Sequence, residues 1–314
     1  MDKKSQIKKR RNKVSAKYSF RDLAKEANGV ILIPCIYDCG SARAAELSGA
    51  KATLLSGGEL GESLGVLEPM LTVDEVVHQV ERICAFSPLP CMVDVGAGFD
   101  TPVNAYFTAK RMVRAGAMAL LLGNERGQSW KDYEPILKAT IKACEGTDCI
   151  VVCRNNDATE TQEQLDYVID FLNKGIDLGA ETTMACGLCR CDDQNNKARY
   201  LGQRVKGWKV YPDQNSINGV PDVDNDVLWE NGFKMVSYHY MMKVALNAMW
   251  RYGIENEKNR NNVASNDVEF PNGLKGHSAL GCMPFQQYFD LEGDFTGVYR
   301  KHRIPGFKAG RENG

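Results

Sequence analysis

The stretch MVDVGAGFD, residues 92–100, ends an apolar run with a carboxylate, Asp94. A charged side chain is costly to bury without a partner, so Asp94 is expected either to cap a turn or to hold a cation or a substrate. Gly96 and Gly98 follow it, and glycine permits both a sharp turn and the close approach of a ligand. The stretch by itself leaves these roles open.

Polar residues close the other apolar runs of the chain as well. In chain order the runs end at Tyr37-Asp38, Ser56-Gly57-Gly58, Asp94, Gly123-Asn124-Glu125, Arg154-Asn155-Asn156-Asp157, Cys186, Asp213 and His239. If one fold brings these ends together, they have the composition expected of a site for a small anionic substrate.

Cys186 begins the segment CGLCRC, which also contains Cys189 and Cys191. The spacing C-x-x-C-x-C could seed an iron–sulfur or zinc site, but paired C-x-x-C motifs are absent and a fourth ligand must come from elsewhere. A reactive thiol at Cys186 is the better interpretation, because a nearby Arg154 would stabilise the thiolate. His239 is either a proton donor or a core imidazole with its hydrogen bonds satisfied.

Eight short apolar runs are predicted to be strands, and helix-length amphipathic segments separate them. The runs are 30–38, 52–58, 90–96, 117–124, 149–157, 181–187, 208–213 and 233–239, and AGA and LGA segments before some of them are typical of helix ends. Continuous apolar strands with helical crossovers predict a parallel sheet buried on both faces. Eight units fit a closed (β/α)8 barrel better than the alternative, an open doubly wound sheet. In a barrel the strand ends meet at one mouth, which makes Asp94 an acid at its rim.

The composition is that of an ordinary globular chain. It has 314 residues, of which 43% are hydrophobic and 25% charged, and a net charge of -1, so no global field attracts nucleic acid or a membrane surface. No apolar run approaches the roughly 18 residues of a membrane span. Eleven cysteines without a secretion signal predict free thiols in a reducing cytosol, and therefore a cytoplasmic protein.

Three regions are expected along the chain. Residues 1–19 include KKSQIKKRRNK and are predicted to be a basic, disordered tail. Residues 20–253 contain all eight predicted strands and form the barrel. Residues 254–314 are rich in Asn, Gly and Lys, have a helical pattern only around PFQQYFDLEG, and form a C-terminal extension without a core of its own.

The segment YDCGSARAAELSGAKATLLSGGELGESLG, residues 37–65, resembles the opening of the isocitrate lyase / phosphoenolpyruvate mutase superfamily. Members carry a YD-x-x-SAR segment, an SGG turn and an S-x-G helix start. The similarity continues through Asp94, the Arg154 of CRNNDA and NGFKMVSYHYMMKVALNAMW, over roughly residues 20–253. The resemblance implies a (β/α)8 TIM-type barrel with a C-terminal helical extension. It also implies a lyase or mutase that breaks or rearranges a bond in a small 2-oxo or 2-hydroxy carboxylic acid, through an enolate.

Such a reaction develops negative charge on an oxygen, which donors already aimed at it would stabilise. The resemblance implies that the backbone of Ser56-Gly57-Gly58 supplies N–H donors and that Arg154 binds the substrate carboxylate through two hydrogen bonds. Cys186 and His239 join these as catalytic candidates. The candidate substrate-binding residues are Tyr37, Asp38, Asn156 and Asp213.

A divalent cation is the cofactor that the resemblance implies. Asp94 would hold Mg2+ (or Mn2+), directly or through water, with Glu68 and Glu125 as the other acids at hand. Mg2+ keeps several waters and needs few protein oxygens, so a partly rebuilt set of acids can still hold it.

The sequence also departs from the family. Gly96, Gly123 and Cys186 stand where members have acids, and Asp213 stands where they have asparagine. Members that are lyases carry a K-K/R-C-G-H gating loop after the fourth strand, whose cysteine acts as acid and base. Here RGQSWKDYEP leads into the next helix, so a different proton donor is needed and the chain is not a conventional isocitrate or methylisocitrate lyase.

Two classes of function follow. The first is a carbon–carbon lyase, or a phosphonopyruvate-type mutase or hydrolase, acting on a small carboxylate. The second is a barrel that has lost the family chemistry and serves as a small-carboxylate binding protein or works by cysteine-based catalysis. Neither class involves nucleic acid or a membrane, and the family resemblance implies a homo-oligomer, a tetramer or dimer, in which the C-terminal extension packs on a neighbouring subunit.

Overall fold

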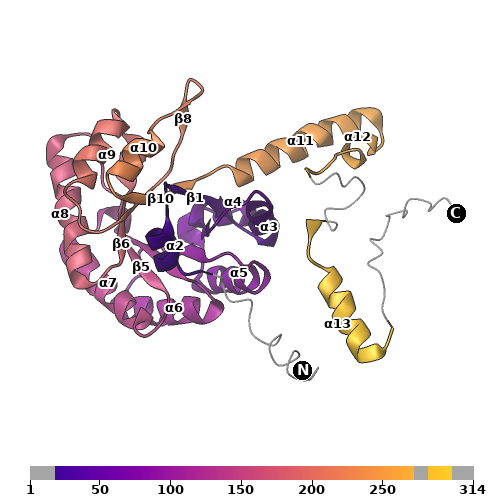
Figure 1. The fold of residues 1–314 in the computed structure, drawn as a ribbon, viewed down its shortest axis with the longest axis horizontal. Helices are drawn as coiled ribbons and strands as arrows, with labels where there is room; N and C mark the ends of the chain where they lie inside the picture. The colour runs from indigo at the N-terminus through magenta and orange to yellow at the C-terminus, as the bar shows by residue number, and fades with distance from the viewer. Residues whose placement is uncertain (1–17, 272–281, 299–314) are drawn as a thin grey trace. The chain divides into compact units, whose positions relative to one another are not determined.

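Eight parallel strands form a closed barrel in the computed structural model, which describes residues 18–271 and 282–298 (Figure 1). They lie in the order β1-β10-β7-β6-β5-β4-β3-β2, and every neighbouring pair is parallel. The strands are β1 (Ile31–Ile36), β2 (Thr53–Leu55), β3 (Cys91–Asp94), β4 (Ala119–Gly123), β5 (Ile150–Asn155), β6 (Thr182–Ala185), β7 (Lys209–Tyr211) and β10 (Phe233–Tyr238). The predicted (β/α)8 barrel is confirmed, and the alternative open sheet is wrong.

Helices follow the strands around the barrel. They are α3 (Cys39–Leu47), α4 (Gly57–Leu64), α5 (Val73–Phe86), α6 (Pro102–Ala115), α7 (Trp130–Cys144), α8 (Gln162–Leu178), α9 (Gln194–Gly202) and α10 (Asn225–Glu230), with short 3-10 turns η1 (Glu68–Met70), η2 (Glu125–Gly127) and η3 (Cys186–Arg190). Gly116 and Gly179 end α6 and α8 in the left-handed conformation, as the AGA and LGA segments predicted. Each described helix is too short or too polar to cross a lipid bilayer.

The barrel interior is an apolar core distinct from the shell between strands and helices. Phe20 and Leu23 of α2 (Phe20–Glu26) are buried in this core, and Arg21 of the same helix pairs with Glu181 at 3.1 Å, just before β6. Helix α2 therefore covers the end of the barrel at which the strands begin. The interior side chains from the strands include Ile33, Leu54, Met92, Leu121, Val152, Met184, Val210 and Met235.

The pleat of the strands decides which polar residues face the mouth. Successive side chains point to opposite faces, so a residue two positions beyond an interior residue points into the barrel again. Met92 and Val152 are interior, and Asp94 and Arg154 accordingly point into the mouth. On other strands, the residues that lie two or four positions beyond an interior residue are Ser56, Gly123, Cys186 and His239.

A short antiparallel hairpin, which we did not predict, follows β7. Its strands are β8 (Ser216–Ile217) and β9 (Val220–Pro221), and Figure 1 shows it projecting from the barrel. Asn218 and Gly219 both have positive φ, at 53° and 81°, which is the backbone that an Asn-Gly pair favours in a two-residue hairpin turn. The Asn-Gly dipeptide is the feature of the sequence from which this hairpin could have been predicted.

The chain divides into two compact units, Met1–Met242 and Lys243–Gly314. Helix α11 (Met241–Asn259) is one continuous helix that contains both this division and the predicted boundary after residue 253. The second unit also contains α12 (Val263–Asn266) and α13 (Gln286–Thr296), so its helical character extends beyond the one segment we predicted. The basic tail lies almost wholly outside the described residues, although Ser19 caps α2.

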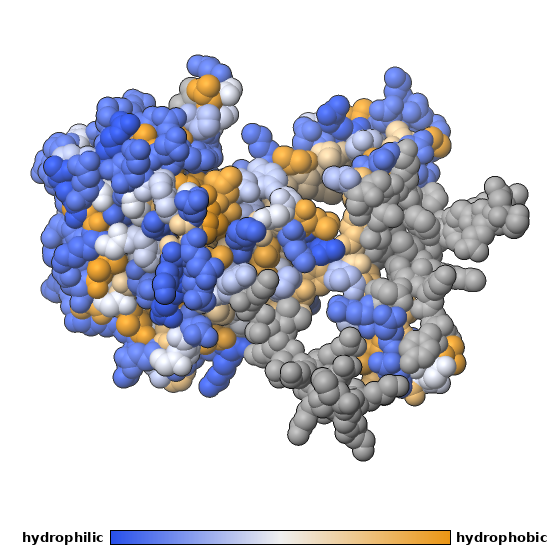
Figure 2. All heavy atoms as spheres, viewed as in Figure 1, coloured by the Kyte–Doolittle hydropathy of each residue, from blue (hydrophilic) through white to orange (hydrophobic). Residues whose placement is uncertain are grey.

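Surface character differs between the two units. Figure 2 shows a mostly hydrophilic outer face on the barrel helices. Helix α11, by contrast, exposes Leu246, Met249 and Trp250, whose side chains are 57%, 61% and 69% accessible. These residues are spaced as i, i+3 and i+4 and therefore share one face of the helix.

We expect Gly98, in the loop after β3, to be essential for stability. Its φ is +73°, and an added Cβ would lie 2.9 Å from Ala105 Cβ and 3.0 Å from Ile136 Cγ2. Gly98→Ala should lower the free energy of unfolding by roughly 2–4 kcal/mol, through left-handed backbone strain and overpacking. Urea unfolding followed by circular dichroism measures this.

Gly146→Ala is the matched control for that prediction. Gly146 has the same φ of +73°, but no described atom lies within 4 Å of its added Cβ, so only the backbone contribution of about 1 kcal/mol is expected. Equal losses in the two variants would show that the packing around Gly98 yields to a methyl group.

Candidate active site

A cavity of about 490 Å³ opens at the mouth of the barrel. It lies where β2, β3 and β4 end, and its lining includes the loop after β3 and the turn η1. Phe99 and Asp100 of this loop have positive φ, at 60° and 95°, an unusual conformation for non-glycine residues. The described lining residues are Gly57, Glu68, Pro69, Leu71, Val76, Asp94, Val95, Gly96, Ala97, Phe99, Asp100, Glu125 and Gln128.

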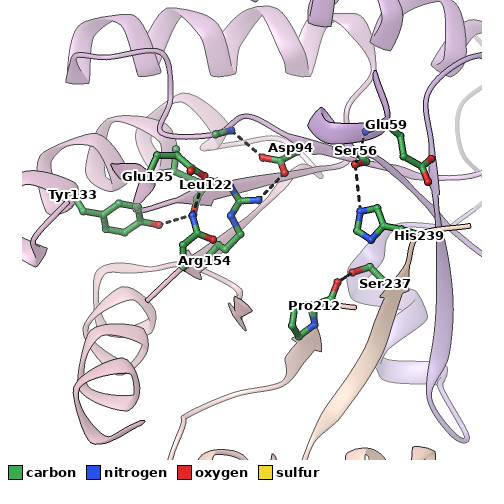
Figure 3. A network of polar contacts seen from close by, with 12 residues as sticks. Ser56, Glu59, Asp94, Leu122, Glu125, Tyr133, Arg154, Pro212, Ser237 and His239 are labelled. Carbon is green, nitrogen blue, oxygen red and sulfur yellow. Dashed lines mark hydrogen bonds and ion pairs between the residues drawn. The ribbon is translucent and has the colours of Figure 1, made fainter. Parts of the chain in front are cut away.

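Arg154 is the centre of a buried ion cluster beside this cavity (Figure 3). Its Nη1 donates to Asp94 Oδ2 at 2.6 Å, and its Nη2 donates to Glu125 Oε1. Burial opposes the charge on Arg154, but the negative charges of Asp94 and its neighbours raise the pKa of the guanidinium and keep it charged. Asp94 therefore fulfils one of the alternatives that its sequence left open, because it has a cationic partner.

The remaining atoms of the cluster are only partly satisfied. Asp94 Oδ1 accepts from the Gly96 N–H at 3.0 Å, and Asn156 Nδ2 donates to Glu125 Oε1 at 2.9 Å. Arg154 Nε is buried and has no hydrogen-bond partner among the described residues. The Nε–H is thus a buried donor whose hydrogen bond no described residue satisfies.

Two glycines provide the space for this cluster, and sequence reasoning missed one of them. A Cβ at Gly123 would lie 2.5 Å from Arg154 Nε and 2.7 Å from its Nη2. The position at which the family resemblance places an acid therefore has no room for a side chain here. A Cβ at Gly57 would overlap the carboxylate of Glu68. The Glu68 carboxylate therefore sits against the first turn of α4, where the helix dipole favours negative charge.

The cavity carries an excess of negative charge. Four of its described lining residues are acidic, namely Glu68, Asp94, Asp100 and Glu125, and none is basic. Burial, followed by the charge of Asp94, raises the pKa of Glu68. A cation in the cavity would relieve this repulsion.

The three predicted metal ligands, Asp94, Glu68 and Glu125, thus line one cavity. Within the described ranges, however, no three His, Cys, Asp or Glu side chains converge closely enough to enclose a metal ion. Carboxylate oxygens are the donors that Mg2+ prefers, and this ion retains several waters. The residues fit a hydrated Mg2+ rather than a metal enclosed by protein.

A second polar cluster lies at the ends of β2, β7 and β10 (Figure 3). His239 Nε2 lies 3.3 Å from Ser56 Oγ, and His239 Nδ1 lies 3.1 Å from Asp213 Oδ1. The backbone N–H of His239 also donates to Asp213 Oδ1 at 3.2 Å. The predicted residues Ser56, Asp213 and His239, which are far apart in sequence, therefore form one hydrogen-bonded chain.

Glu59 lies behind this cluster, and sequence reasoning did not single it out. Its side chain is buried, with 6% of the residue exposed, and its Oε2 has no hydrogen-bond partner in the part of the chain that the structure describes. Burial raises the pKa of Glu59 to about 7, against the opposing charge of His239. Its position directly after Ser56-Gly57-Gly58 is the feature of the sequence from which its place at the site could have been predicted.

Ser56 has a local structural role besides its contact with His239. It is the N-cap of α4, and its Oγ accepts from the Glu59 N–H at 3.3 Å. The predicted turn at Ser56-Gly57-Gly58 is thus a strand-to-helix turn. Its first helical residue, Gly57, lines the cavity.

The expectation of a low pKa at Cys186 is wrong. Cys186 is buried, and burial raises the pKa of its thiol to about 11, although the charge of Arg154 opposes the shift. Cys189 and Cys191 donate their S–H groups to the backbone oxygens of Cys186 and Leu188. Desolvation of the thiolate therefore outweighs the nearby cation, and the segment CGLCRC is a hydrogen-bonded 3-10 turn.

Tyr37 and Asp38 serve the local fold. Asp38 caps α3, and its Oδ1 accepts from the Ser41 N–H at 2.7 Å and from Ser41 Oγ at 2.8 Å. The backbone oxygen of Tyr37 accepts from Gln79 Nε2 at 2.7 Å. Neither residue is among the described lining of the cavity, so their role in substrate binding stays a prediction.

The connection after β4 is short, as predicted. Strand β4 ends at Gly123, the turn η2 follows, and α7 begins at Trp130. Asn124 anchors the connection, since its Nδ2 donates to Asp157 Oδ2 at 2.9 Å and its Oδ1 accepts from the Asn156 N–H at 2.6 Å.

We expect Glu59→Gln to change how stability depends on pH. The folded pKa of about 7 lies above the ordinary value of 4.5, so the protonated carboxyl stabilises the fold below pH 4.5, and this contribution is lost as pH rises through 7. The shift corresponds to roughly 3 kcal/mol. Between pH 5 and pH 8, Glu59→Gln should therefore gain roughly 2–3 kcal/mol of unfolding free energy relative to the wild type.

Urea unfolding at the two pH values measures the effect. Glu62→Gln, an exposed change on the same helix, should follow the wild type within about 0.5 kcal/mol. A parallel course for the wild type and Glu59→Gln would show that Glu59 is ionised at little cost in the folded protein.

Comparisons with known proteins agree with the fold. The phosphoenolpyruvate phosphomutase family model matches residues 20–255. The chain is 26% identical over 230 residues to the chloroplastic carboxyvinyl-carboxyphosphonate phosphorylmutase of Arabidopsis thaliana. The aligned region covers 67% of this chain and 66% of that protein, which is just under two thirds of its length. The chain is also 26% identical over 229 residues to the 2-methylisocitrate lyase of Bacillus subtilis, which covers 70% of this chain and 74% of that one.

Solved structures share the barrel. The crystal structure of oxaloacetate acetylhydrolase matches with a TM-score of 0.77 and 17% identity, over 91% of this chain and 100% of that one. At this identity the match shows the fold alone. The family match spans the barrel and both polar clusters of its mouth, and the chain belongs to the phosphoenolpyruvate phosphomutase family.

Proposed function

We propose that this protein is a lyase- or mutase-type enzyme that cleaves or rearranges a bond in a small 2-oxo or 2-hydroxy carboxylic acid through an enolate. The observation that carries the proposal is the Asp94–Arg154–Glu125 cluster beside a cavity of about 490 Å³ at the mouth of the barrel. Active sites of (β/α)8 enzymes lie at this end, and the volume suits a small organic acid with its waters.

Arg154 is the proposed carboxylate-binding residue. Its Nε is buried, so a substrate carboxylate would bind the guanidinium by displacing one of the two protein carboxylates from the terminal nitrogens. The guanidinium fork matches a carboxylate in a plane, which fixes the orientation of the reacting bond. The N-terminal turn of α4, which starts at Gly57, offers backbone N–H groups to a developing enolate oxygen.

Mg2+ is the proposed cofactor, with Asp94, Glu68 and Glu125 as the residues that would hold it. The excess of acids in the cavity supports this assignment, because an anionic substrate would otherwise meet net negative charge. When bound, the ion would polarise the substrate carbonyl and stabilise the enolate charge. Asn156 would keep Glu125 in position through its hydrogen bond.

A specific observation also favours the second class of function. Both terminal nitrogens of Arg154 are already paired with protein carboxylates, so the cation is neutralised before any substrate arrives. A barrel that has lost the family chemistry and only binds carboxylates, or binds none, would keep such a cluster for stability. Cysteine-based catalysis has less support, since burial raises the pKa of Cys186.

Calorimetry with Mg2+ and oxalate, a planar mimic of an enolate, separates the two classes. We expect the wild type to bind oxalate only with Mg2+. Asp94→Asn keeps the size of the side chain but removes its charge, and should weaken Mg2+ binding at least about tenfold. Arg154→Lys loses the two-pronged fork and should weaken oxalate binding roughly ten- to a hundredfold.

Matched surface variants provide the controls. Asp170→Asn and Arg111→Lys alter exposed ion pairs on α8 and α6 and should bind both ligands like the wild type. Full oxalate affinity of Asp94→Asn in excess chelator would exclude the metal, and unchanged affinity of Arg154→Lys would exclude its role. A wild type that binds neither ligand would favour a barrel without the family chemistry.

We further propose that the second unit, Lys243–Gly314, packs on a second copy of the chain, giving a dimer or tetramer. The exposed face of α11 formed by Leu246, Met249 and Trp250 supports this, since apolar side chains of this size gain by burial. A cytoplasmic location stays a prediction from composition.

Light scattering of the full chain tests the oligomer. The wild type should have the mass of a dimer or tetramer, and a Met249→Glu, Trp250→Glu double variant should shift toward the monomer because it buries two charges in the contact. Ala248→Glu adds a charge to the opposite face of α11 and should not change the mass. A monomeric wild type would contradict the proposal.

A further inference from the structure

We propose that Asp213, His239 and Ser56 form a proton-transfer relay at the mouth of the barrel, in which His239 is the acid–base residue of the reaction and the other two position it. The inference rests on the function proposed above and adds the group that gives the enolate carbon its proton. It assigns to this chain a catalytic histidine directly after the last strand of the barrel.

The geometry fixes the imidazole from three sides. Asp213 Oδ1 lies 3.1 Å from His239 Nδ1 and also accepts from the His239 backbone N–H at 3.2 Å. One carboxylate oxygen thus binds both the ring and the backbone of the same residue, which holds the proton on Nδ1 and leaves Nε2 for chemistry. Ser56 Oγ lies 3.3 Å from Nε2, so that nitrogen points toward the start of α4, beside Gly57.

Accessibility separates the three roles. The His239 side chain is 42% exposed and can be reached from the mouth, whereas Ser56 is buried at the start of α4. Ser56 adjoins Gly57, which lines the cavity. His239 is not among the described residues that line the cavity, but it contacts Ser56, the chain neighbour of the lining residue Gly57. Ser56 and Asp213 support it from the end of β2 and the end of β7.

Surrounding acids set the charge of the imidazole. Burial lowers the pKa of His239, but the hydrogen bond and charge of Asp213, with the charges of Glu59 and Asp94, raise it above its usual value. The charge of His239 in turn lowers the pKa of Glu68, against the larger effect of burial. The net shift favours the protonated imidazole, which is the form that a proton donor requires.

The cysteines considered from the sequence are poorly suited as proton donors. Burial raises the pKa of the Cys186 thiol to about 11, so it exchanges protons slowly near neutrality. The connection between β4 and α7 contains no cysteine. His239, by contrast, is accessible, and Asp213 and Ser56 hold its ring.

The step balances as follows for a 2-hydroxy acid. The carbon–carbon bond breaks, its electron pair forms the enolate, and the hydroxyl proton leaves to solvent as the new carbonyl forms. The Nε2 proton of His239 then moves to the enolate carbon. Solvent returns a proton to the neutral imidazole. In the reverse half-reaction, neutral His239 removes a proton from the carbon next to a carbonyl.

That reverse half-reaction can be measured without the natural substrate. The full chain with Mg2+ is incubated with pyruvate in D2O, and the loss of the methyl proton signal is followed by NMR. His239→Asn should slow the exchange at least about 100-fold. Its oxalate affinity should stay within about threefold of the wild type. His78→Asn, an exposed change on α5, should exchange at the wild-type rate.

The positioning role of Asp213 has its own readout. Exchange needs neutral His239, so its rate should rise with pH through the pKa of this residue. Asp213→Asn removes the main interaction that raises that pKa, so the midpoint should move to lower pH. The rate on the plateau should fall about tenfold, because the ring is no longer held. A residue that only supported the fold would lower the rate without moving the midpoint.

The outcomes separate this relay from the proposed function. Exchange by His239→Asn at the wild-type rate, or an unmoved midpoint in Asp213→Asn, would overturn the relay and leave the function standing. Oxalate binding by a wild type that exchanges no protons would also overturn the relay alone. A wild type that neither binds oxalate nor exchanges protons would overturn both.

Discussion

The mouth of this barrel depends on the need of one buried cation for anionic partners. Arg154 is 8% exposed, and a guanidinium at such a depth costs several kcal/mol unless charge and hydrogen bonds compensate it. Asp94 from β3 and Glu125 from the turn after β4 supply the compensation, and Gly123 leaves the space in which the guanidinium lies. Neighbouring strands are tied together by charge at the place where the cavity opens. Removing one partner would leave the others buried and uncompensated.

The same low-dielectric surroundings connect the two polar clusters. Asp94 pairs with Arg154, yet its charge also contributes to the raised pKa values of Glu68 and His239. Acids that the family resemblance places at Gly96 and Gly123 are absent, whereas Asp94 and Glu68 remain, and Glu125 and Glu59 add carboxyl groups from other positions. Carboxyl groups are therefore still present at the mouth, in a different arrangement. This arrangement places a titratable pair, Glu59 and His239, beside the strand-to-helix turn at Ser56.

Burial explains where reasoning from residue types failed. Cys186 lies near a cation, which argues for a thiolate, but desolvation exceeds that attraction and raises the pKa of the thiol. Gly123 looked like a lost acid and instead gives room to Arg154. The outcome in each case depends on the distance to a residue that is remote in sequence, or on how far the group is removed from water. The order of residues along the chain gives neither quantity.

The sequence by itself determined the architecture. Its eight apolar runs and helical spacers predict the barrel, and the two-residue period of a strand sets which side chains enter the mouth, because both depend on local geometry. The predicted residues Ser56, Asp94, Arg154 and His239 accordingly lie there. Only the tertiary structure decided which of them are partners: that Arg154 pairs with Asp94 and Glu125, and that His239 joins Ser56 and Asp213. Hydrogen bonds and desolvation act over a few ångströms, so closure of the barrel had to bring these groups within reach before their chemistry was defined.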